Sequence, residues 1–456
     1  QAELLWRIPL VLSVLTIGGC FVGMERPAPP TISSQASFSS QLPLTHAEVE
    51  PASTWWRSAV PEGLWLPLEQ AIAADPTLRR AQAQATAALA RWRQAEANTG
   101  LNLSLGASAD IQTLSGDRTD SQSIDVDARL PIDANGALGL RVDAARSLWI
   151  ATSADAEQLR SDLARDFLIA QLDGAEANQR HALLLRQIDL AETLLRLIEL
   201  RFTQGLASSV DVLQQRDQVA SLRQELPQAR LDQQQAANRL RRIGARTPEQ
   251  ASPLVVEPLP EVSGTFVSVE PIDLLRRRAL LRASGARLAA ADAGFAAALA
   301  DRWPTLQLSA FTLSRALAGD VTTLLAGALD AAVTLFDSGN LEALATERRA
   351  QLVAAGQQYL ADWLDAVIEV DDLIHQEASL RERIKLSEQR LENAEALLKA
   401  AQRRYEQGVS DYLPVLAALR GMQQQQRDQL ALQAELARSR VRLHRALGHP
   451  MAAGTT

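Results

Sequence analysis

The residues of this chain that could carry chemistry begin with a single thiol. Cys20 is the one cysteine among 456 residues, and it follows the short apolar stretch 8–19 with small residues directly before it. That arrangement suits cleavage by a signal peptidase and acylation of the thiol. The stretch is also shorter than the roughly 20 apolar residues that span a bilayer. We therefore predict a lipoprotein signal peptide at 1–20 with Cys20 as the lipid anchor. A plain secretory signal with a free thiol is the alternative.

Two carboxylates form the second candidate site. Asp211 and Asp411 each follow a glycine that should turn the chain, Gly205 and Gly408. Carboxylates held close together resist ionising at the same time and attract cations, so a ring of them would form a selective aperture. Alternatively, both aspartates cap a helix or lie in water beside a turn.

No motif in the sequence indicates catalysis. The five histidines lack metal-ligand spacing, and neither a glycine-rich phosphate loop nor a serine nucleophile motif is found. We therefore expect no enzyme, no cofactor and no metal site. The net charge of −8 also argues against a nucleic-acid partner.

The elements that must position these residues alternate between helices and strands. A helical pattern over 64–98 is broken at Asp75-Pro76. Alternating apolar and polar residues then predict strands around 101–105 and 124–130, with the polar stretch 115–120 as a loop between them.

Two long helices should follow these strands. Helical periodicity covers 138–202, which at ~1.5 Å per residue would reach about 100 Å. A second helix is expected at 210–243, with a kink at Pro227. Helices this long need lateral packing into a bundle or tube. Glutamine-rich positions would then face water, namely Gln214, Gln215, 233–235 and 423–426.

The second half of the chain repeats the first. Phe202-Thr203-Gln204-Gly205-Leu206 recurs as Tyr405-Glu406-Gln407-Gly408-Val409, and Val212-Leu213 recurs at the same offset as Val415-Leu416. Strand 101–105 is matched by 306–309, and a fourth strand is expected at 326–335. Each half therefore runs helix, strand, loop, strand, long helix, tight turn, long helix. The predicted segments are a signal peptide at 1–20, a tether at 21–62, a first repeat at 63–252, a linker at 253–270, a second repeat at 271–449 and a tail at 450–456.

The paired strands predict a membrane barrel shared between several copies of the chain. An open strand edge leaves backbone groups unpaired in lipid, and the smallest membrane barrels have about eight strands. Four strands per chain cannot close such a barrel alone. The leucines would face lipid, and water would be lined by Asn102, Ser104, Asp125, Asp127, Arg129, Gln307 and Ser309.

Taken in order, these motifs resemble a known family. The chain is similar to the outer-membrane efflux proteins, the TolC-like channel-tunnels, and within them to the lipoprotein branch that serves resistance-nodulation-division pumps. The resemblance covers nearly the whole chain. Its motifs are Trp55-Trp56, Leu240-Arg241-Arg242-Ile243-Gly244, Pro271-Ile272-Asp273-Leu274-Leu275, Trp303-Pro304, Leu335-Phe336-Asp337-Ser338-Gly339 and Tyr412-Leu413-Pro414-Val415-Leu416.

This resemblance implies a mainly α-helical protein with a β-barrel portion. Three chains would share a twelve-stranded barrel in the outer membrane, and their helical hairpins would form a tunnel in the periplasm. The implied function is a passive channel for drugs or other toxic small molecules within a tripartite efflux pump. Its partners would be a periplasmic adaptor and an inner-membrane resistance-nodulation-division pump. The resemblance also implies adaptor contacts at the hairpin tips through Phe202, Gly205, Tyr405 and Gly408, and a closed aperture lined by Asp211, Asp411 and Tyr412.

The chain departs from the family pattern in three places. Ala279-Leu280 stands where a proline and an acidic residue usually start a helix, at a cost of about 1 kcal/mol. Gly285 replaces a common glutamate, and Ala417 replaces a frequent aspartate, so one expected acidic ring is missing. A diverged pump partner is one explanation.

Two other functions stay open from the sequence. The same fold could serve as the exit duct of a type I protein secretion system, although Trp55-Trp56 and the lipoprotein features favour small-molecule efflux. A periplasmic coiled-coil scaffold without a pore would leave the paired strands unexplained.

Overall fold

A computed structural model describes most of the chain between residues 25 and 448. The described residues are 25–32, 37–39, 44–45, 62–114, 117–252, 259, 266–267, 270–317, 320–334 and 336–448. The predicted signal peptide with Cys20, the Trp55-Trp56 motif and the tail at 450–456 lie outside them, as do most of the predicted tether and linker.

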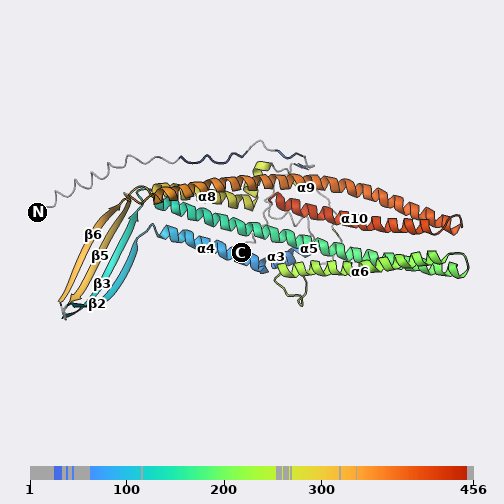
Figure 1. Cartoon of the computed structure of the whole chain (residues 1–456), viewed down its shortest axis with the longest axis horizontal. Coiled ribbons are helices and arrows are strands. Elements are labelled where there is room, and N and C mark those ends of the chain that lie inside the picture. The colour runs from blue at the N-terminus through green and yellow to red at the C-terminus, as the bar shows by residue number, and fades with distance from the viewer. Residues whose placement is uncertain are drawn as a thin grey trace. The chain divides into compact units, whose positions relative to one another are not determined.

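The described elements occur in the same order in both halves of the chain (Figure 1). The first half contains α3 (Trp65–Ala74), α4 (Pro76–Ala97), β2 (Asn102–Leu114), β3 (Asp117–Ile132), α5 (Ala137–Thr203) and α6 (Ser209–Ile243). The second half contains α7 (Leu274–Arg277), α8 (Ala279–Ala300), β5 (Thr305–Leu317), β6 (Asp320–Ala332), α9 (Asn340–Glu406) and α10 (Leu413–Ala446). A parallel bridge pairs β1 (Leu44–Thr45) with β4 (Phe266–Val267). The predicted internal repeat is confirmed.

The break between α3 and α4 lies where the sequence places it. One carboxylate oxygen of Asp75 accepts hydrogen bonds from the backbone N–H groups of Thr77 at 2.7 Å and Leu78 at 3.2 Å. Pro76 occupies the first position of α4, where the helix needs no N–H donor. Asp75 therefore acts as the N-cap of α4.

The matching break in the second half lacks that proline and is capped by another helix. Arg278 is extended and α8 begins at Ala279. The backbone N–H of Leu280 donates a hydrogen bond to Oε1 of Gln158 on α5 over 3.3 Å. This long-range contact satisfies one of the free donors at the helix start, which offsets part of the expected cost of about 1 kcal/mol.

The strands form one unit of the chain together with residues 25–31 and the adjoining helix ends, within 92–145 and 288–357. The sheet order is β2-β3-β5-β6, and all neighbours are antiparallel. The predicted loop at 115–120 is wrong in extent, because the ladder continues until Leu114 pairs with Asp117. The fourth strand lies at Asp320–Ala332 rather than at 326–335.

The register gives the sheet two different faces. Ser104 pairs with Asp127, and Leu105 pairs with Val126. Since paired residues point to the same side of a sheet, the first pair lies on a polar face and the second on an apolar face. This agrees with the alternation predicted for β2 and β3. The apolar face is exposed within the chain at Leu103, Leu105, Ile124, Leu325 and Leu329.

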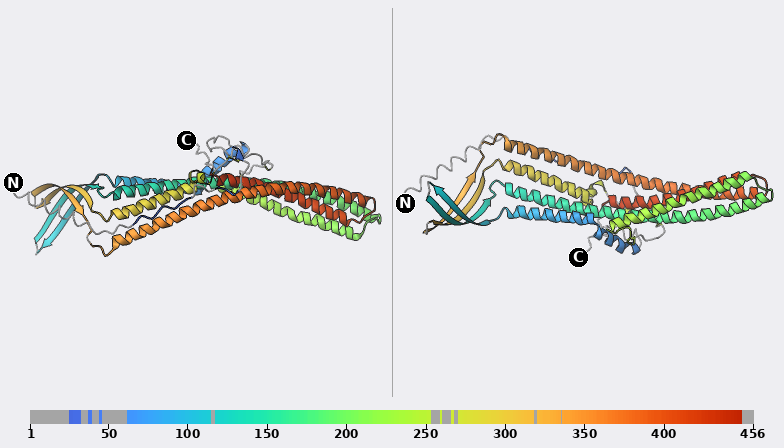
Figure 2. Two further views of the ribbon diagram at one scale, coloured as in Figure 1. Left: turned by 90° about the horizontal axis from the view of Figure 1, so that it is seen from above. Right: turned by 60° about the horizontal axis from the view of Figure 1, so that its bottom comes forward.

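Two helical hairpins complete the fold. Helices α5 and α9 contain 67 residues each, so each extends over about 100 Å, as predicted. Helices α6 and α10 return alongside them, and Figure 2 shows the two hairpins side by side. Pro227 lies inside α6, which continues past it. Among the described residues, no helix combines the length and the apolarity that crossing a membrane requires.

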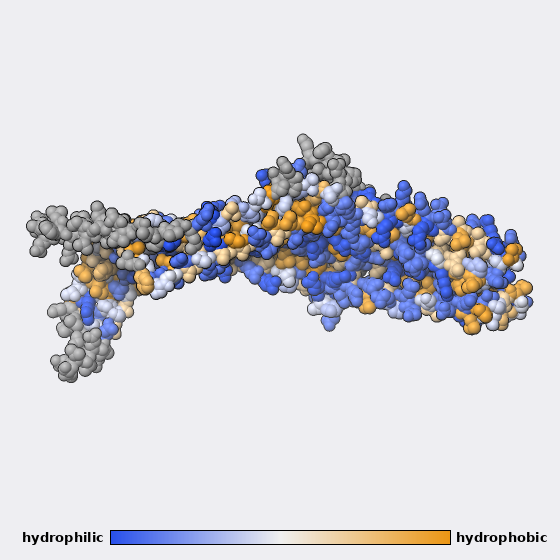
Figure 3. Space-filling model, turned by 45° about the horizontal axis from the view of Figure 1, so that its top comes forward, coloured by the Kyte–Doolittle hydropathy of each residue, from blue (hydrophilic) through white to orange (hydrophobic). Residues whose placement is uncertain are grey.

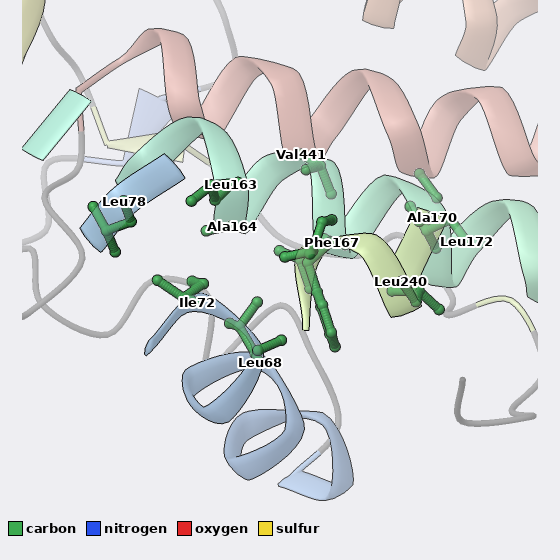
Figure 4. Packing of buried hydrophobic residues seen from close by; sticks show 14 residues of the cluster. Leu68, Ile72, Leu78, Leu163, Ala164, Phe167, Ala170, Leu172, Leu240 and Val441 are labelled. Carbon is green, nitrogen blue, oxygen red and sulfur yellow. The ribbon is translucent and has the colours of Figure 1, made fainter. Parts of the chain in front are cut away.

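Helix α3 and most of both hairpins belong to the second unit, which lies within residues 32–91, 146–287 and 358–456. Its main core is seen in Figure 4, where Leu68 and Ile72 of α3 face Phe167 of α5. Leu240 of α6 and Val441 of α10 complete the same cluster. Phe167 and Leu68 are fully buried, so α3 is fixed against three of the long helices by apolar packing.

Candidate functional site

Both hairpins turn at a glycine with the same geometry. Gly205 has a φ of +75° and Gly408 a φ of +70°. The N–H after each glycine donates to the carbonyl five residues earlier, Leu206 to Arg201 at 2.8 Å and Val409 to Arg404 at 3.0 Å. This left-handed ending of a helix favours glycine over all other residues. The two predicted tips are therefore equivalent turns.

The helix starts after the two turns differ. Ser208 and Asp211 form a reciprocal capping box at the start of α6, with bonds of 3.2 and 2.9 Å between side chain and backbone. Helix α10 instead begins with Pro414 in its first turn and without a side-chain cap on Tyr412. Asp411 is exposed beside that start. Asp211 thus stabilises a helix end in addition to presenting charge.

A tyrosine pair fills the core of the tip. Tyr412 is 1% exposed, and its ring meets Tyr405 edge-on at 5.5 Å between ring centres. The guanidinium group of Arg201 lies over the Tyr405 ring at 4.5 Å, a favourable cation–π distance. Both rings belong to a cluster that joins α5, α6, α9 and α10.

Burial changes the acidity of these two tyrosines. It raises the pKa of the Tyr412 hydroxyl, and Tyr405 and Asp211 raise it further while Arg420 opposes them. Burial also raises the pKa of Tyr405, against the opposing charge of Arg201. Both hydroxyl groups therefore keep their protons at neutral pH.

Above the tyrosines, side-chain amides connect the two hairpins. Nε2 of Gln218 donates to Oε1 of Gln423 over 2.9 Å, and Nε2 of Gln187 donates to Oε1 of Gln426 over 2.9 Å. The hydroxyl of Tyr412 donates to Oε1 of Gln215 over 2.6 Å. We call these five glutamines the amide layer.

The amide layer corrects one expectation from the sequence. Gln215 and Gln423 are 0% exposed and Gln218 is 5% exposed, so these side chains do not face water. Each amide makes at least one hydrogen bond to another helix, which removes part of the cost of burying it, while Nε2 of Gln423 has no partner among the described residues. The sequence did contain a sign of this burial. Gln215 and Gln218 lie three and six residues after the apolar Val212. They therefore share the side of α6 that carries Val219 and Leu222.

The tip surface carries apolar residues that the chain itself leaves uncovered, as the orange groups at the end of the hairpins in Figure 3 show. Phe202 is 45% exposed, Leu206 62% and Val409 65%. A groove of about 500 Å³ runs along α9 and α10 nearby. Ala417 lines this groove and contributes an apolar side chain to its wall. The other lining residues include Ala394, Leu397, Ala401, Pro414 and Gly421.

Apart from Cys20, which lies outside the described residues, the predicted site residues lie at the tips in different environments. Phe202, Gly205 and Gly408 are exposed at the turns, and Tyr405 is half-buried. Tyr412 is enclosed within the chain and supports the tip from inside. The sequence analysis did not name Gln218 or Arg420, and it placed Gln423 in water. Arg420 donates hydrogen bonds to Gln218 and to Asp217. Among the described residues, no group of three His, Cys, Asp or Glu side chains could hold a metal ion.

Comparison with known proteins identifies the relatives of this architecture. The model of the family described as outer membrane efflux protein matches residues 68–245 and 271–449. The pyoverdine export outer membrane protein OpmQ of Pseudomonas putida is 26% identical over 97% of this chain and 97% of its own length. Outer membrane protein OprJ of Pseudomonas aeruginosa is 27% identical over 91% of this chain and 89% of its own. The solved structure of the outer-membrane channel OprN has a TM-score of 0.85 at 25% identity, covering 94% of this chain and 99% of that one.

Two repeated halves, each with a strand pair and a long helical hairpin, define a TolC-like outer-membrane channel protein. The chain belongs to the outer membrane efflux protein family. It is an outer-membrane efflux component, as predicted from the sequence. The family consists of channel components rather than enzymes.

Proposed function

We propose that three copies of this chain close one twelve-stranded barrel in the outer membrane, with their hairpins forming a tunnel in the periplasm. The assembly passively conducts small toxic molecules that an inner-membrane resistance-nodulation-division pump delivers through a periplasmic adaptor. The observation that carries this proposal is the four-stranded sheet, whose edge strands β2 and β6 each pair on one side within the described residues.

A sheet of this kind cannot be stable in lipid by itself. Its strands of 13 to 16 residues exceed the roughly 9–11 residues that a tilted strand needs to cross a membrane. Free backbone groups at β2 and β6 would be unpaired in lipid. Pairing β6 of one copy with β2 of the next satisfies both edges and leaves the apolar face toward lipid.

Cys20 anchors the assembly in this proposal. A lipid chain on its thiol would hold the N-terminal segment at the membrane surface, in addition to the barrel. The support is the apolar stretch and the small residues before Cys20 in the sequence. Metabolic labelling with palmitate, compared between the wild type and Cys20→Ser, tests it, and equal labelling would contradict it.

The hairpin tips have two proposed roles. Phe202, Gly205, Tyr405 and Gly408 contact the adaptor, since exposed apolar side chains surround the two turns. Asp211 and Asp411 form carboxylate rings at the closed aperture, and the buried Tyr412 holds the second tip in place. Replacing Phe202 with Ser should weaken adaptor binding without straining the turn. Normal adaptor binding by this variant and by a bulky substitution at Gly205 would contradict the contact.

The aperture is tested by removing charge while keeping the helix cap. In the double variant Asp211→Asn, Asp411→Asn, the amide oxygen at 211 can still accept from the Ser208 N–H. Single-channel recordings should show a reduced preference for cations over anions. An unchanged reversal potential would rule out the carboxylate rings.

The barrel is tested with two neighbouring residues of β2. Leu105→Arg places a charge on the lipid face, at an expected cost of about 2–4 kcal/mol near the bilayer midplane. Ser104→Arg places the same charge on the opposite face, beside Asp127. The first variant should fail to form heat-resistant trimers in the outer membrane, and the second should assemble and conduct ions. Equal assembly of both variants, or a wild-type protein that never conducts ions, would contradict the proposal.

A further inference from the structure

In the proposed barrel, the face of the sheet that carries Ser104 and Asp127 lies toward water. This face is not polar throughout. Asp127 on β3 pairs with Phe311 on β5, which pairs with Ala326 on β6. Two residues away along β3, Asp125 pairs with Leu313, which pairs with Leu324. Since paired residues share a face, each aspartate has an apolar residue beside it on the next two strands.

These apolar residues form a patch that cannot be assigned to lipid. We call Phe311, Leu313, Leu324, Ala326 and Ala328 the inner patch. The opposite face carries Leu103, Leu105, Leu325 and Leu329, which suit lipid contact. Leu324 of the inner patch is 53% exposed, so the chain itself leaves this patch partly uncovered.

Charged side chains of both signs share a face with the inner patch, and carboxylates outnumber guanidinium groups among those described. The described side chains of this face include four carboxylates and two guanidinium groups, at Asp110, Asp125, Asp127, Asp330, Arg129 and Arg315. Arg129 lies 3.8 Å from Asp127, and Arg315 donates to the Ser121 hydroxyl over 3.2 Å. The Ser309 hydroxyl donates to Asp330 over 2.8 Å.

Gly106 makes room for the carboxylate of Asp125. A Cβ atom at Gly106 would come within 2.5 Å of one carboxylate oxygen of Asp125. The Asp125 side chain therefore lies across the neighbouring strand β2, where any larger residue would displace it. The charge of Asp125 is held against the sheet, on the level of Leu313 and Leu324.

We infer that this face of the sheet binds lipophilic organic cations, with the apolar body on the inner patch and the positive charge beside Asp125 and Asp127. The inference rests on the proposed function and names the class of cargo that the channel favours. Apolar contact and charge complementarity act together, and the Phe311 ring adds a face that attracts cations. Such binding is weak, and each copy of the chain provides one site. Weak binding at several sites allows the cargo to leave the channel again.

The test uses three probes on reconstituted wild-type channels. Tetraphenylphosphonium is a lipophilic cation, tetraphenylborate is an anion of the same shape, and tetramethylammonium is a cation without the apolar body. Tetraphenylphosphonium should reduce the single-channel current at about tenfold lower concentration than either of the others. The amount of a given probe that the bilayer lipid takes up does not depend on the protein variant. Differences between variants in the response to that probe therefore come from the protein.

Two variants separate the contributions. Leu313→Ser with Leu324→Ser should weaken the effect of tetraphenylphosphonium by about tenfold, whereas Asp125→Asn should remove the advantage of the cation over the anion. Thr312→Ser, on the opposite face, is the control and should change neither.

The inference is overturned if the wild type responds equally to the two tetraphenyl ions, or if the variants respond as the wild type does. A wild-type protein that conducts normally but ignores all three probes overturns this inference and leaves the proposed channel intact. A protein that does not conduct at all overturns both.

Discussion

The hydroxyl group of Tyr412 donates a hydrogen bond to Oε1 of Gln215 over 2.6 Å, and the amide of Gln215 donates to the carbonyl of Ala191 over 2.7 Å. One chain of bonds thus runs from the start of α10 through α6 to α5. Because Gln215 and Tyr412 are both buried, water cannot replace either bond without entering the tip.

Replacing Tyr412 with Phe should therefore destabilise the tip by about 1–3 kcal/mol, the cost of leaving a buried acceptor without its donor. Hydrogen exchange at the ends of α6 and α10 would measure the loss. Tyr405→Phe is the matched control, since the Tyr405 hydroxyl has no hydrogen-bond partner within the described residues. Equal protection in the two variants would show that the bond contributes nothing.

Tyrosine ionisation should couple to stability at alkaline pH. The chain has three tyrosines, and burial raises the pKa of Tyr359, Tyr405 and Tyr412. The unfolded chain ionises first, near pH 10. The stabilisation is thus fully present below about pH 10 and is lost as the pH rises through the folded pKa values. Tyrosinate absorbance should rise later in the folded protein than in denaturant, and coincident curves would contradict this. Tyr412→Phe should reduce the separation.

The two tip glycines should resist substitution for a backbone reason. An added Cβ at Gly205 or Gly408 meets no described atom within 4 Å, yet both residues have positive φ. Gly205→Ala and Gly408→Ala should each cost roughly 1–2 kcal/mol. Gly421→Ala in α10, with equal space and ordinary φ, should instead stabilise the helix by about 1 kcal/mol. Urea unfolding of the purified protein measures the change in the free energy of unfolding for all three variants. An unchanged free energy for Gly205→Ala would contradict backbone strain at this position.

Arg438 of α10 binds two carboxylates of α5. It lies 2.7 Å from Asp173, contacts Glu176, and is only 15% exposed. Arg438→Met leaves these carboxylates partly unpaired, with an expected loss of about 3–5 kcal/mol. Arg239, 2.8 Å from Asp173, should keep the loss at the lower end.

The control for this variant is an exposed pair of the same kind. Arg216 lies 2.7 Å from Glu199 with side chains 59% and 38% exposed. Arg216→Met should therefore cost less than ~1 kcal/mol in thermal unfolding. Similar costs for the two variants would mean that burial does not strengthen the Arg438 contacts.

Much of the fold could be predicted because it is encoded locally. The Asp75-Pro76 break and the glycine turns at 205 and 408 depend on a few neighbouring residues. The long helices were predicted to within a residue or two because their periodicity continues for many turns. The extent of β3 was not predictable from its polar residues, since its first residues are held by pairing with β2.

The site was harder to predict because its contacts cross between helices far apart in sequence. Nothing near Gln423 indicates that its partner is Gln218, and nothing near Leu280 indicates a cap from Gln158. Tyr412 was expected to line the closed aperture, yet the packing of four helix ends encloses its ring within the chain. Such burial depends on tertiary structure, which overrides local polarity.

The equal length of α5 and α9 also restricts how this protein can diverge. Each helix has 67 residues, and inserting one residue would shift everything beyond it by about 1.5 Å and rotate it by about 100°. Such a change in one helix would shift and rotate the tip of its hairpin relative to the tip of the other hairpin. Insertions and deletions should therefore accumulate in the connecting segments, and appear in these two helices only as matched pairs.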